Sequence, residues 1–263
     1  MKTLISFLLA CSLFVLVPSA AFANTLPSAS EGAYRWYVQR NQEHKTPTLP
    51  SEFSFLKDHG GWYCDTRPNC EKKLYLTFDA GYENGNVSKI LDVLKEHEVP
   101  AAFFILEHLV TAETSLVRRM IDEGHLVCNH TARHKNLSRS TRAEFRQELE
   151  RMEAVYREKM GCEIARYYRP PEGVFSIENL SLAVEMGYQT VFWSFAYADW
   201  DNQHQPNPDK AIEKILLHTH PGAVLLLHPT SGTNAEILPK LISQWKEMGY
   251  TFGTLDELTA VKD

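Results

Sequence analysis

Short apolar runs alternate with longer helical stretches from Lys72 onward, and this alternation restricts the possible folds more than any other feature of the chain. The predicted strands are 73–79, 101–106, 125–130, 167–169, 189–195, 223–228 and 251–255. The predicted helices lie near 86–97, 113–123, 141–160, 177–186, 208–219 and 235–248, and several end at a glycine. Strands separated by helices form a mostly parallel sheet, and strands that are apolar throughout are covered on both faces.

We therefore expect an α/β fold, a deformed (β/α) barrel of about seven parallel strands. A closed or nearly closed barrel fits this pattern better than an open doubly wound sheet. No Gly-x-Gly-x-x-Gly motif follows the first strand, so a dinucleotide-binding fold has no support.

The N-terminus has the pattern of a secretory signal peptide. Lys2 precedes an apolar run over 4–17, and Ala21-Phe22-Ala23 forms a small-x-small cleavage site. The run is shorter than the ~18 residues that a membrane-spanning helix needs. A membrane anchor and a lipoprotein signal at Cys11 are the alternatives. We expect a signal peptide over 1–23.

Residues 24–71 show no clear periodicity, and several prolines interrupt them. Aromatic residues such as Trp36 and Phe53 are frequent there, whereas a free linker contains few. We expect an irregular arm over 24–71, packed on a catalytic domain over 72–263.

The charges and cysteines exclude some classes of site. The formal net charge is −6 and no Lys/Arg run occurs, which argues against a nucleic-acid partner. Cys64 and Cys70 bracket a short polar turn, so in an exported protein they suggest a local disulfide. Cys128 and Cys162 stand in apolar surroundings and are expected to be buried free thiols. Because no Cys-x-x-Cys pair occurs, a thiolate zinc site is not expected.

Polar residues stand at the C-terminal ends of the predicted strands. These residues are Asp79, His130, Arg169, Asp199 (just past its strand) and His228. Each could separately be a turn residue, a core histidine or a surface charge. In β/α barrels, however, this end of the strands carries the active site, and the matching positions of all five favour a common site.

His130 and His134 have a His-x-x-x-His spacing. One helical turn would place both imidazoles on the same side, as metal binding requires. No Glu follows His130, so this is not the metalloprotease motif. A further ligand must come from elsewhere, with Asp79 or its neighbourhood as the candidate. Two histidines, a carboxylate and water suit zinc or a similar divalent ion.

Five segments resemble, in order, the motifs of the polysaccharide deacetylases, the NodB homology family or carbohydrate esterase family 4. These segments are Thr77-Phe78-Asp79-Ala80-Gly81, His130-Thr131-Ala132-Arg133-His134, Arg169-Pro170-Pro171-Glu172, Asp199-Trp200 and Leu225-Leu226-Leu227-His228. The match covers about 72–255. Segments 77–85, 169–176 and 189–194 resemble more closely the delta-lactam-biosynthetic de-N-acetylases of spore-forming bacteria. Members of that subgroup deacetylate N-acetylmuramic acid in peptide-free peptidoglycan, which leads to the muramic δ-lactam of spore cortex.

The resemblance implies a role for each polar residue. His130 and His134 would bind a divalent metal, Asp79 would be the general base and His228 the general acid. Arg169 would pair with Asp79, and Asp199 would hold Arg169 and tune His228.

The backbone N–H of Glu172 would stabilise the oxyanion, and Trp193, Tyr197 and Trp200 could stack on sugar rings. Position 80 departs from the family, because Ala stands where a metal-binding Asp is usual; the resembled subgroup also tends to lack this Asp. Metal affinity is therefore in question.

The resemblance further implies a partner and a location. We expect the protein to be a monomer, secreted to the cell envelope around the forespore, acting on peptidoglycan strands after an N-acetylmuramoyl-L-alanine amidase. An N-acetylglucosamine deacetylase of peptidoglycan or chitin is the alternative within the family. Outside it, the alternatives are an amidase, a glycosidase that uses Asp79 and Asp199 as its two carboxylates, and a non-catalytic glycan-binding module, which Ala80 would favour.

Overall fold

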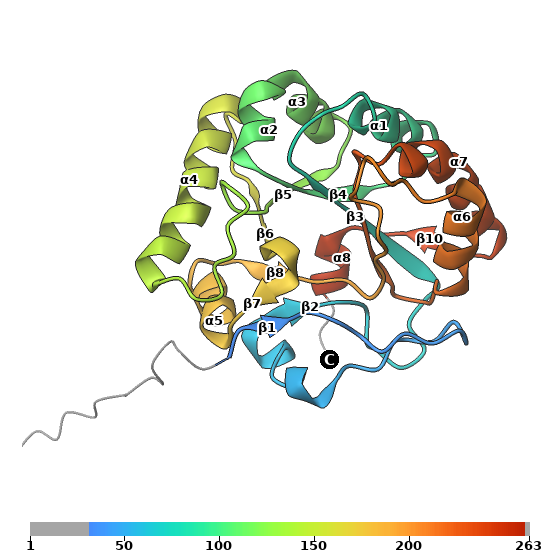
Figure 1. Ribbon diagram of the computed structural model, residues 1–263, viewed down its shortest axis with the longest axis horizontal. Coiled ribbons are helices and arrows are strands. Elements are labelled where there is room, and N and C mark those ends of the chain that lie inside the picture. The colour runs from blue at the N-terminus through green and yellow to red at the C-terminus, as the bar shows by residue number, and fades with distance from the viewer. Residues whose placement is uncertain (1–31, 261–263) are drawn as a thin grey trace, which may run out of the picture.

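The computed structural model describes residues 32–260, so the predicted signal peptide over 1–23 lies outside the described residues. Parallel strands form a curled sheet with helices around it (Figure 1). The strands are β2 (Gly61–Trp62), β3 (Lys73–Ala80), β4 (Ala101–Ile105), β5 (Leu126–Asn129), β6 (Ala165–Tyr168), β8 (Gln189–Val191), β9 (Val224–Leu227) and β10 (Thr251–Phe252). Their order is β10-β3-β4-β5-β6-β8-β2, with β9 also paired to β3. The predicted α/β fold with a deformed barrel is confirmed.

The barrel approaches closure through the segment that follows β8. Phe195 forms a parallel bridge with Leu225, and the Leu226 N–H donates to the Phe195 carbonyl at 2.9 Å. Because β9 pairs with β3 on its other side, it links the segment after β8 to β3, and the sheet curls back on itself. The arm supplies β2, which pairs in parallel with β8 and which the periodicity did not predict.

Helices cover the outside of the sheet (Figure 1). They are α1 (Val87–Glu96), α2 (Glu107–Ala112), α3 (Thr114–Asp122), α4 (Arg142–Met160), α5 (Ile177–Glu185), α6 (Pro208–Leu217) and α7 (Gly232–Glu247). The last helix, α8 (Leu255–Thr259), is not part of this outer layer. The last predicted strand is too long, because a capping box between Thr254 and Glu257 begins α8 at Leu255. The short helix α2 was also not predicted.

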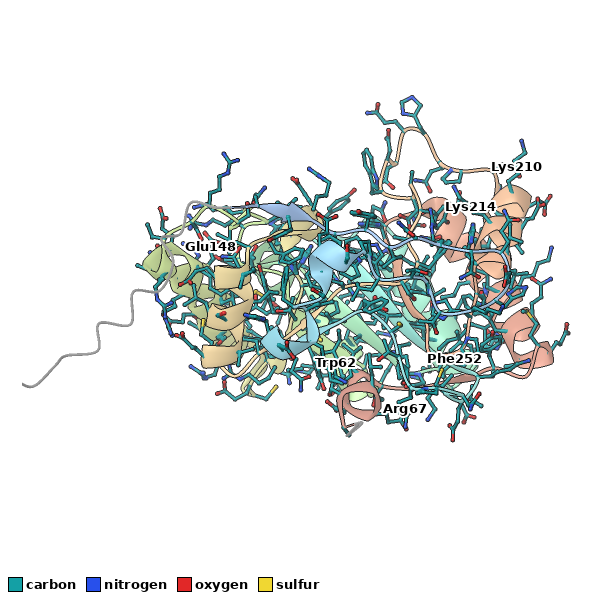
Figure 2. The ribbon with its side chains drawn as sticks, turned by 90° about the horizontal axis from the view of Figure 1, so that it is seen from below. Trp62, Arg67, Glu148, Lys210, Lys214 and Phe252 are labelled. Atoms are coloured by element: carbon teal, nitrogen blue, oxygen red, sulfur yellow. The ribbon has the colours of Figure 1, made fainter. Side chains whose placement is uncertain are left out.

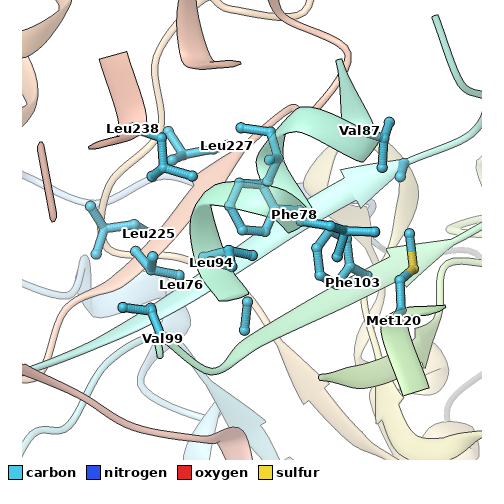
Figure 3. Packing of buried hydrophobic residues seen from close by; sticks show 14 of the residues in the cluster. Leu76, Phe78, Val87, Leu94, Val99, Phe103, Met120, Leu225, Leu227 and Leu238 are labelled. Carbon is cyan, nitrogen blue, oxygen red and sulfur yellow. The ribbon is translucent and has the colours of Figure 1, made fainter. Parts of the chain in front are cut away.

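Alternation along β3 divides the core into two layers. Leu76 and Phe78 belong to the large cluster between the strands and the outer helices (Figure 3). Tyr75 belongs instead to the cluster inside the barrel, together with Leu255 and Leu258 of α8. Since α8 contributes two side chains to this inner cluster, it fills one end of the barrel. Asp79 has the same parity as Tyr75, which directs its side chain into the barrel near the opposite end.

The described part of the arm packs on the barrel. Its strand β1 (Tyr34–Arg35) pairs antiparallel with β7 (Val174–Phe175). Trp36 is buried and stacks on Phe192 with ring centroids 4.5 Å apart. The single turns η1 (Ser51–Phe53) and η2 (Lys57–His59) follow, and η3 (Pro171–Gly173) lies before β7. The domain boundary at residue 71 stays a prediction.

The cysteines differ from two predictions. Cys64 and Cys70 are both free. The predicted disulfide between them is therefore not formed; Cys64 is buried in the arm's apolar cluster, and Cys70 lies half-buried in the turn. Cys162 is exposed, because Gly161 ends α4 in a left-handed conformation just before it; Cys128 is buried as predicted. No helix within residues 32–260 is long and apolar enough to cross a bilayer.

Candidate active site

A cleft of about 700 Å³ opens at the C-terminal ends of the strands. It is lined by every residue that the sequence assigned to the site except Arg169 and Asp199, which are fully buried. The lining residues from that set are Asp79, His130, His134, Glu172, Trp193, Tyr197, Trp200 and His228. Figure 2, which views the molecule from below, shows its two faces in profile, with Lys210 at the start of α6 towards one face and Trp62 and Phe252 towards the other. The structure therefore brings the predicted residues to one end of the barrel.

Arg169 supports Asp79 from inside the barrel. Its side chain is 0% exposed, and Nη1 donates to Asp79 Oδ1 at 2.7 Å. Nη2 donates to Thr77 Oγ1 at 2.9 Å and to the Phe192 carbonyl at 3.2 Å, while Nε donates to the Val191 carbonyl at 2.9 Å. A buried guanidinium is tolerated when its donors are satisfied in this way. The predicted contact between Arg169 and Asp79 is present.

His130 lies beside this ion pair. Its Nδ1 is 2.9 Å from the Arg169 carbonyl, which can only accept, so Nδ1 carries a hydrogen. Nε2 is 3.6 Å from Asp79 Oδ2. Burial lowers the pKa of His130 to about 4 although the Asp79 charge opposes this, and the imidazole is neutral near pH 7. The lone pair of Nε2 therefore faces a carboxylate oxygen, an arrangement that suits a cation or a bound water between them.

The pKa of Asp79 is lowered by its surroundings. Burial alone would raise it, but the charge of Arg169, followed by His130 and His228, outweighs burial. The carboxylate is thus ionised and available as a proton acceptor at neutral pH.

His134 reaches the site from a loop, so the predicted helical turn over 130–134 is wrong. Thr131 (φ 71°) and His134 (φ 56°) are left-handed, and the Thr131 N–H donates to Asn129 Oδ1 at 2.9 Å. This sharp loop still places the His130 and His134 rings 5.0 Å apart between centroids. His134 is exposed, whereas His130 is buried.

Asp199 binds His228 and not Arg169, which corrects the predicted contact. Oδ1 accepts from His228 Nδ1 at 2.7 Å, and Oδ2 accepts from the His228 N–H at 2.8 Å. Asn234 Nδ2 donates to the same Oδ2 at 2.6 Å. The physical reason is that each nitrogen of Arg169 already has an acceptor elsewhere.

This arrangement raises the pKa of His228. Burial would lower it, but the hydrogen bond and charge of Asp199, helped by the charge of Asp79, outweigh burial. With Nδ1 bound to Asp199, Nε2 is the nitrogen left for the cleft. Asn234 was not predicted, because it lies within α7 and belongs to none of the quoted motifs.

Glu172 and the aromatic residues form the cleft wall. Glu172 is left-handed (φ 59°, ψ 7°), a conformation that costs a non-glycine residue about 1 kcal/mol. Trp200 is 63% exposed and Trp193 is half-buried. Tyr82 and Arg35 also line the cleft and were not predicted. Tyr82 directly follows the motif over 77–81 and could have been found; Arg35 stands in the arm, where no motif marks it.

The metal-ligand set is incomplete. No cluster of three or more His, Cys, Asp or Glu side chains suited to a metal occurs within residues 32–260. Position 80 supplies only a methyl group. His130 is suited to be a metal ligand, because the hydrogen bond from Nδ1 to a backbone carbonyl leaves the lone pair of Nε2 available for a metal ion. The residues therefore fit an open site held by two imidazoles, and not a closed site with three protein ligands.

Comparison with known proteins agrees with this geometry. The polysaccharide deacetylase family profile matches residues 66–191. The chain is 37% identical to peptidoglycan-N-acetylmuramic acid deacetylase PdaA of Bacillus subtilis, over 96% of this chain and 95% of that one. The solved structure of B. subtilis PdaA, described as a family 4 carbohydrate esterase, superposes with a TM-score of 0.82 at 38% identity, covering 86% of this chain and 97% of that one.

Two further relatives show the breadth of the family. A peptidoglycan-N-acetylglucosamine deacetylase of Bacillus cereus is 30% identical over 90% of this chain and 84% of that one. BA3943 of Bacillus anthracis, described as a family 4 pseudoenzyme, is 29% identical with a TM-score of 0.69, over 75% of this chain and 68% of that one. The family is in general metal-dependent. The chain belongs to the polysaccharide deacetylases, family 4 of the carbohydrate esterases, and is a hydrolase that removes N-acetyl groups from carbohydrate.

Proposed function

We propose that the protein deacetylates N-acetylmuramic acid in peptide-free peptidoglycan strands, the step that leads to muramic δ-lactam in spore cortex. Similarity to B. subtilis PdaA over nearly the whole of both chains supports the substrate. The observation that supports the chemistry is that Asp79 and His228 line the same cleft, where the pKa of Asp79 is lowered and the pKa of His228 is raised. Such a pair separates a proton acceptor from a proton donor at neutral pH.

The two side chains divide the proton transfers. The Asp79 carboxylate takes a proton from water as the water oxygen bonds to the acetamide carbon. His228 Nε2, charged through its contact with Asp199, gives a proton to the sugar nitrogen as the carbon–nitrogen bond breaks. Acetate and a free amine result. Glu172 lines the cleft, and its backbone N–H would stabilise the oxyanion of the tetrahedral intermediate.

Arg169 keeps Asp79 ionised and fixed in orientation throughout. His130 and His134 would hold a divalent metal, which we propose to be zinc and which would polarise the acetamide carbonyl when bound. Since the chain offers two imidazoles, we expect metal to be held weakly.

The similarity to PdaA, a peptidoglycan-N-acetylmuramic acid deacetylase, also supports an extracytoplasmic location. We place the protein in the space around the forespore, as a monomer that follows an N-acetylmuramoyl-L-alanine amidase, because that enzyme generates the peptide-free strands.

Mass spectrometry of glycan strands with and without stem peptides, after incubation with enzyme and added Zn²⁺ or EDTA, tests the proposal. We expect loss of acetyl groups from muramic residues of peptide-free strands. The Asp79→Asn and His228→Ala variants should lose the activity by orders of magnitude while remaining folded. Deacetylation confined to glucosamine residues would favour the alternative substrate. Binding of the strands without any acetate release would favour a non-catalytic glycan-binding module.

A further inference from the structure

Arg35 is fixed on the wall of the cleft by its neighbours. It pairs with Val174 in the β1–β7 ladder. On its other side, the Trp36 N–H donates to the Gly173 carbonyl at 2.8 Å, and Trp36 Nε1 donates to the Trp193 carbonyl at 2.9 Å. Gly173 permits this close approach, because a Cβ there would lie 3.1 Å from Trp36 Cβ and 2.8 Å from Trp193 Cη2. The Arg35 backbone is therefore held in place, although it comes from an otherwise irregular arm.

The guanidinium of Arg35 is weakly engaged. Its side chain is 73% exposed, and its ionic partner is Glu172, 53% exposed, with 4.0 Å between Nη2 and Oε2. An exposed ion pair at this separation contributes little to stability. An incoming carboxylate could therefore take the place of Glu172 at small cost. The planar fork of a guanidinium binds a carboxylate with two parallel hydrogen bonds.

Apart from Glu172, the other charged side chains of the cleft have close partners. Asp79 pairs with Arg169 at 2.7 Å and His228 with Asp199 at 2.7 Å. Among the described residues that line the cleft, Arg35 is the one lysine or arginine. It is consequently the cation in the wall that is left for an anionic group of a ligand.

We propose that Arg35 is a specificity-determining residue that binds the lactyl carboxylate of N-acetylmuramic acid, an inference that rests on the proposed function. N-acetylmuramic acid differs from N-acetylglucosamine by this group, which is attached at the ring carbon next to the one that bears the acetamide. A carboxylate there lies close to the reacting amide and within the same cleft. A stem peptide converts the carboxylate into a neutral amide, so Arg35 would also select peptide-free strands.

The test compares one glycan with two states of the same group. Two substrates are prepared from the same peptide-free strands. One keeps its free lactyl carboxylates, and in the other the lactyl carboxylates are converted to methylamides. Acetate release is measured for the wild type, Arg35→Gln, Arg35→Lys and the control Lys45→Gln, which removes an exposed charge from the same arm. We expect the wild type to prefer the carboxylate form, and Arg35→Gln to lose roughly ten- to hundredfold in kcat/KM on that form, mainly through KM. Its activity on the methylamide form should stay as in the wild type.

Two further readouts complete the test. Arg35→Lys should retain part of the preference, and the preference of the wild type should shrink at high salt because an exposed charge contact is screened. Equal discrimination by Arg35→Gln and the wild type, or none by the wild type, would overturn the role of Arg35. Absence of acetate release from both glycans would instead refute the proposed function. In that case binding of both glycans to wild type and Arg35→Gln still decides whether Arg35 recognises the carboxylate.

Discussion

His125 lies immediately before β5 and is buried, with 7% of its surface exposed. Neither ring nitrogen has a hydrogen-bond partner among the described residues, and the ring packs edge-on against Phe103 at 5.5 Å between centroids. Burial lowers the pKa of His125 from 6.5 to about 4; Glu123 raises it slightly and Arg119 adds to the lowering. The folded protein thus holds a neutral imidazole that the unfolded chain would protonate more readily.

The sign of the pH dependence follows from these two pKa values. Between pH 6.5 and 4 the unfolded chain binds more protons at this residue, so the free energy of unfolding falls as pH falls through this window. The loss from His125 alone is about 2 kcal/mol at pH 5 and about 3 kcal/mol below pH 4, whereas it vanishes above pH 7. We therefore predict that His125→Leu gains stability over the wild type on acidification.

Urea unfolding at pH 8 and pH 5, followed by tryptophan fluorescence, measures the effect. At pH 8 the variant should be at least as stable as the wild type, because it removes two unpaired polar atoms from the interior. At pH 5 its advantage should grow by about 2 kcal/mol, equivalent to roughly 4–8 °C in Tm. Acid-sensitive groups elsewhere are shared by both proteins and cancel in the comparison.

His108→Leu, at an exposed position of α2, is the matched control and should show the same stability difference at both pH values. The kcat/KM of His125→Leu at pH 8 should equal that of the wild type, since His125 and His130 lie at opposite ends of one strand, about 16 Å apart. An advantage that is the same at pH 5 as at pH 8 would refute the reasoning.

Three further predictions concern the cleft. Asp199→Asn should lower kcat by at least about tenfold and shift the alkaline limb of the kcat/KM profile to lower pH, because it removes the charge that raises the His228 pKa; an unchanged limb would contradict this. Trp200→Ala should raise KM several-fold without altering urea stability, since the side chain is 63% exposed; an unchanged KM for long glycan strands would argue against sugar stacking there. His134→Ala should raise the Zn²⁺ concentration needed for half-maximal activity while leaving the unfolding curve unchanged, and equal zinc titrations would exclude it as a ligand.

Most of the fold could be predicted because alternating apolar and helical segments leave few architectures. The missed helix α8 had a visible signal, since Thr254 and Glu257 have the spacing of a capping box. The segment over 251–255 was nevertheless interpreted as a continuous strand from its apolar residues. The strand β2 had no comparable signal, because two residues in an irregular arm carry no periodicity.

The positions of polar residues at the strand ends predicted which side chains gather in the site, but not which of them form hydrogen bonds or ion pairs with one another. His134 was expected on a helical turn, because the residue types between it and His130 give no sign that the backbone of Thr131 is left-handed. Contacts across the barrel depend on strand register, which the order of motifs does not contain. The assignment of Asp199 to Arg169 was wrong for this reason.

Arg169 shows what the sequence leaves undetermined. With α8 filling one end of the barrel, a side chain on the inner face below Asp79 has no access to water, and a guanidinium there is tolerated because each of its nitrogens meets an acceptor. Besides Asp79, those acceptors are Thr77 of β3 and the carbonyls of Val191, the last residue of β8, and Phe192 just after it. These segments lie far apart in the sequence. The arginine can therefore orient Asp79 from beneath without occupying the cleft, which leaves the open end of the barrel to the substrate.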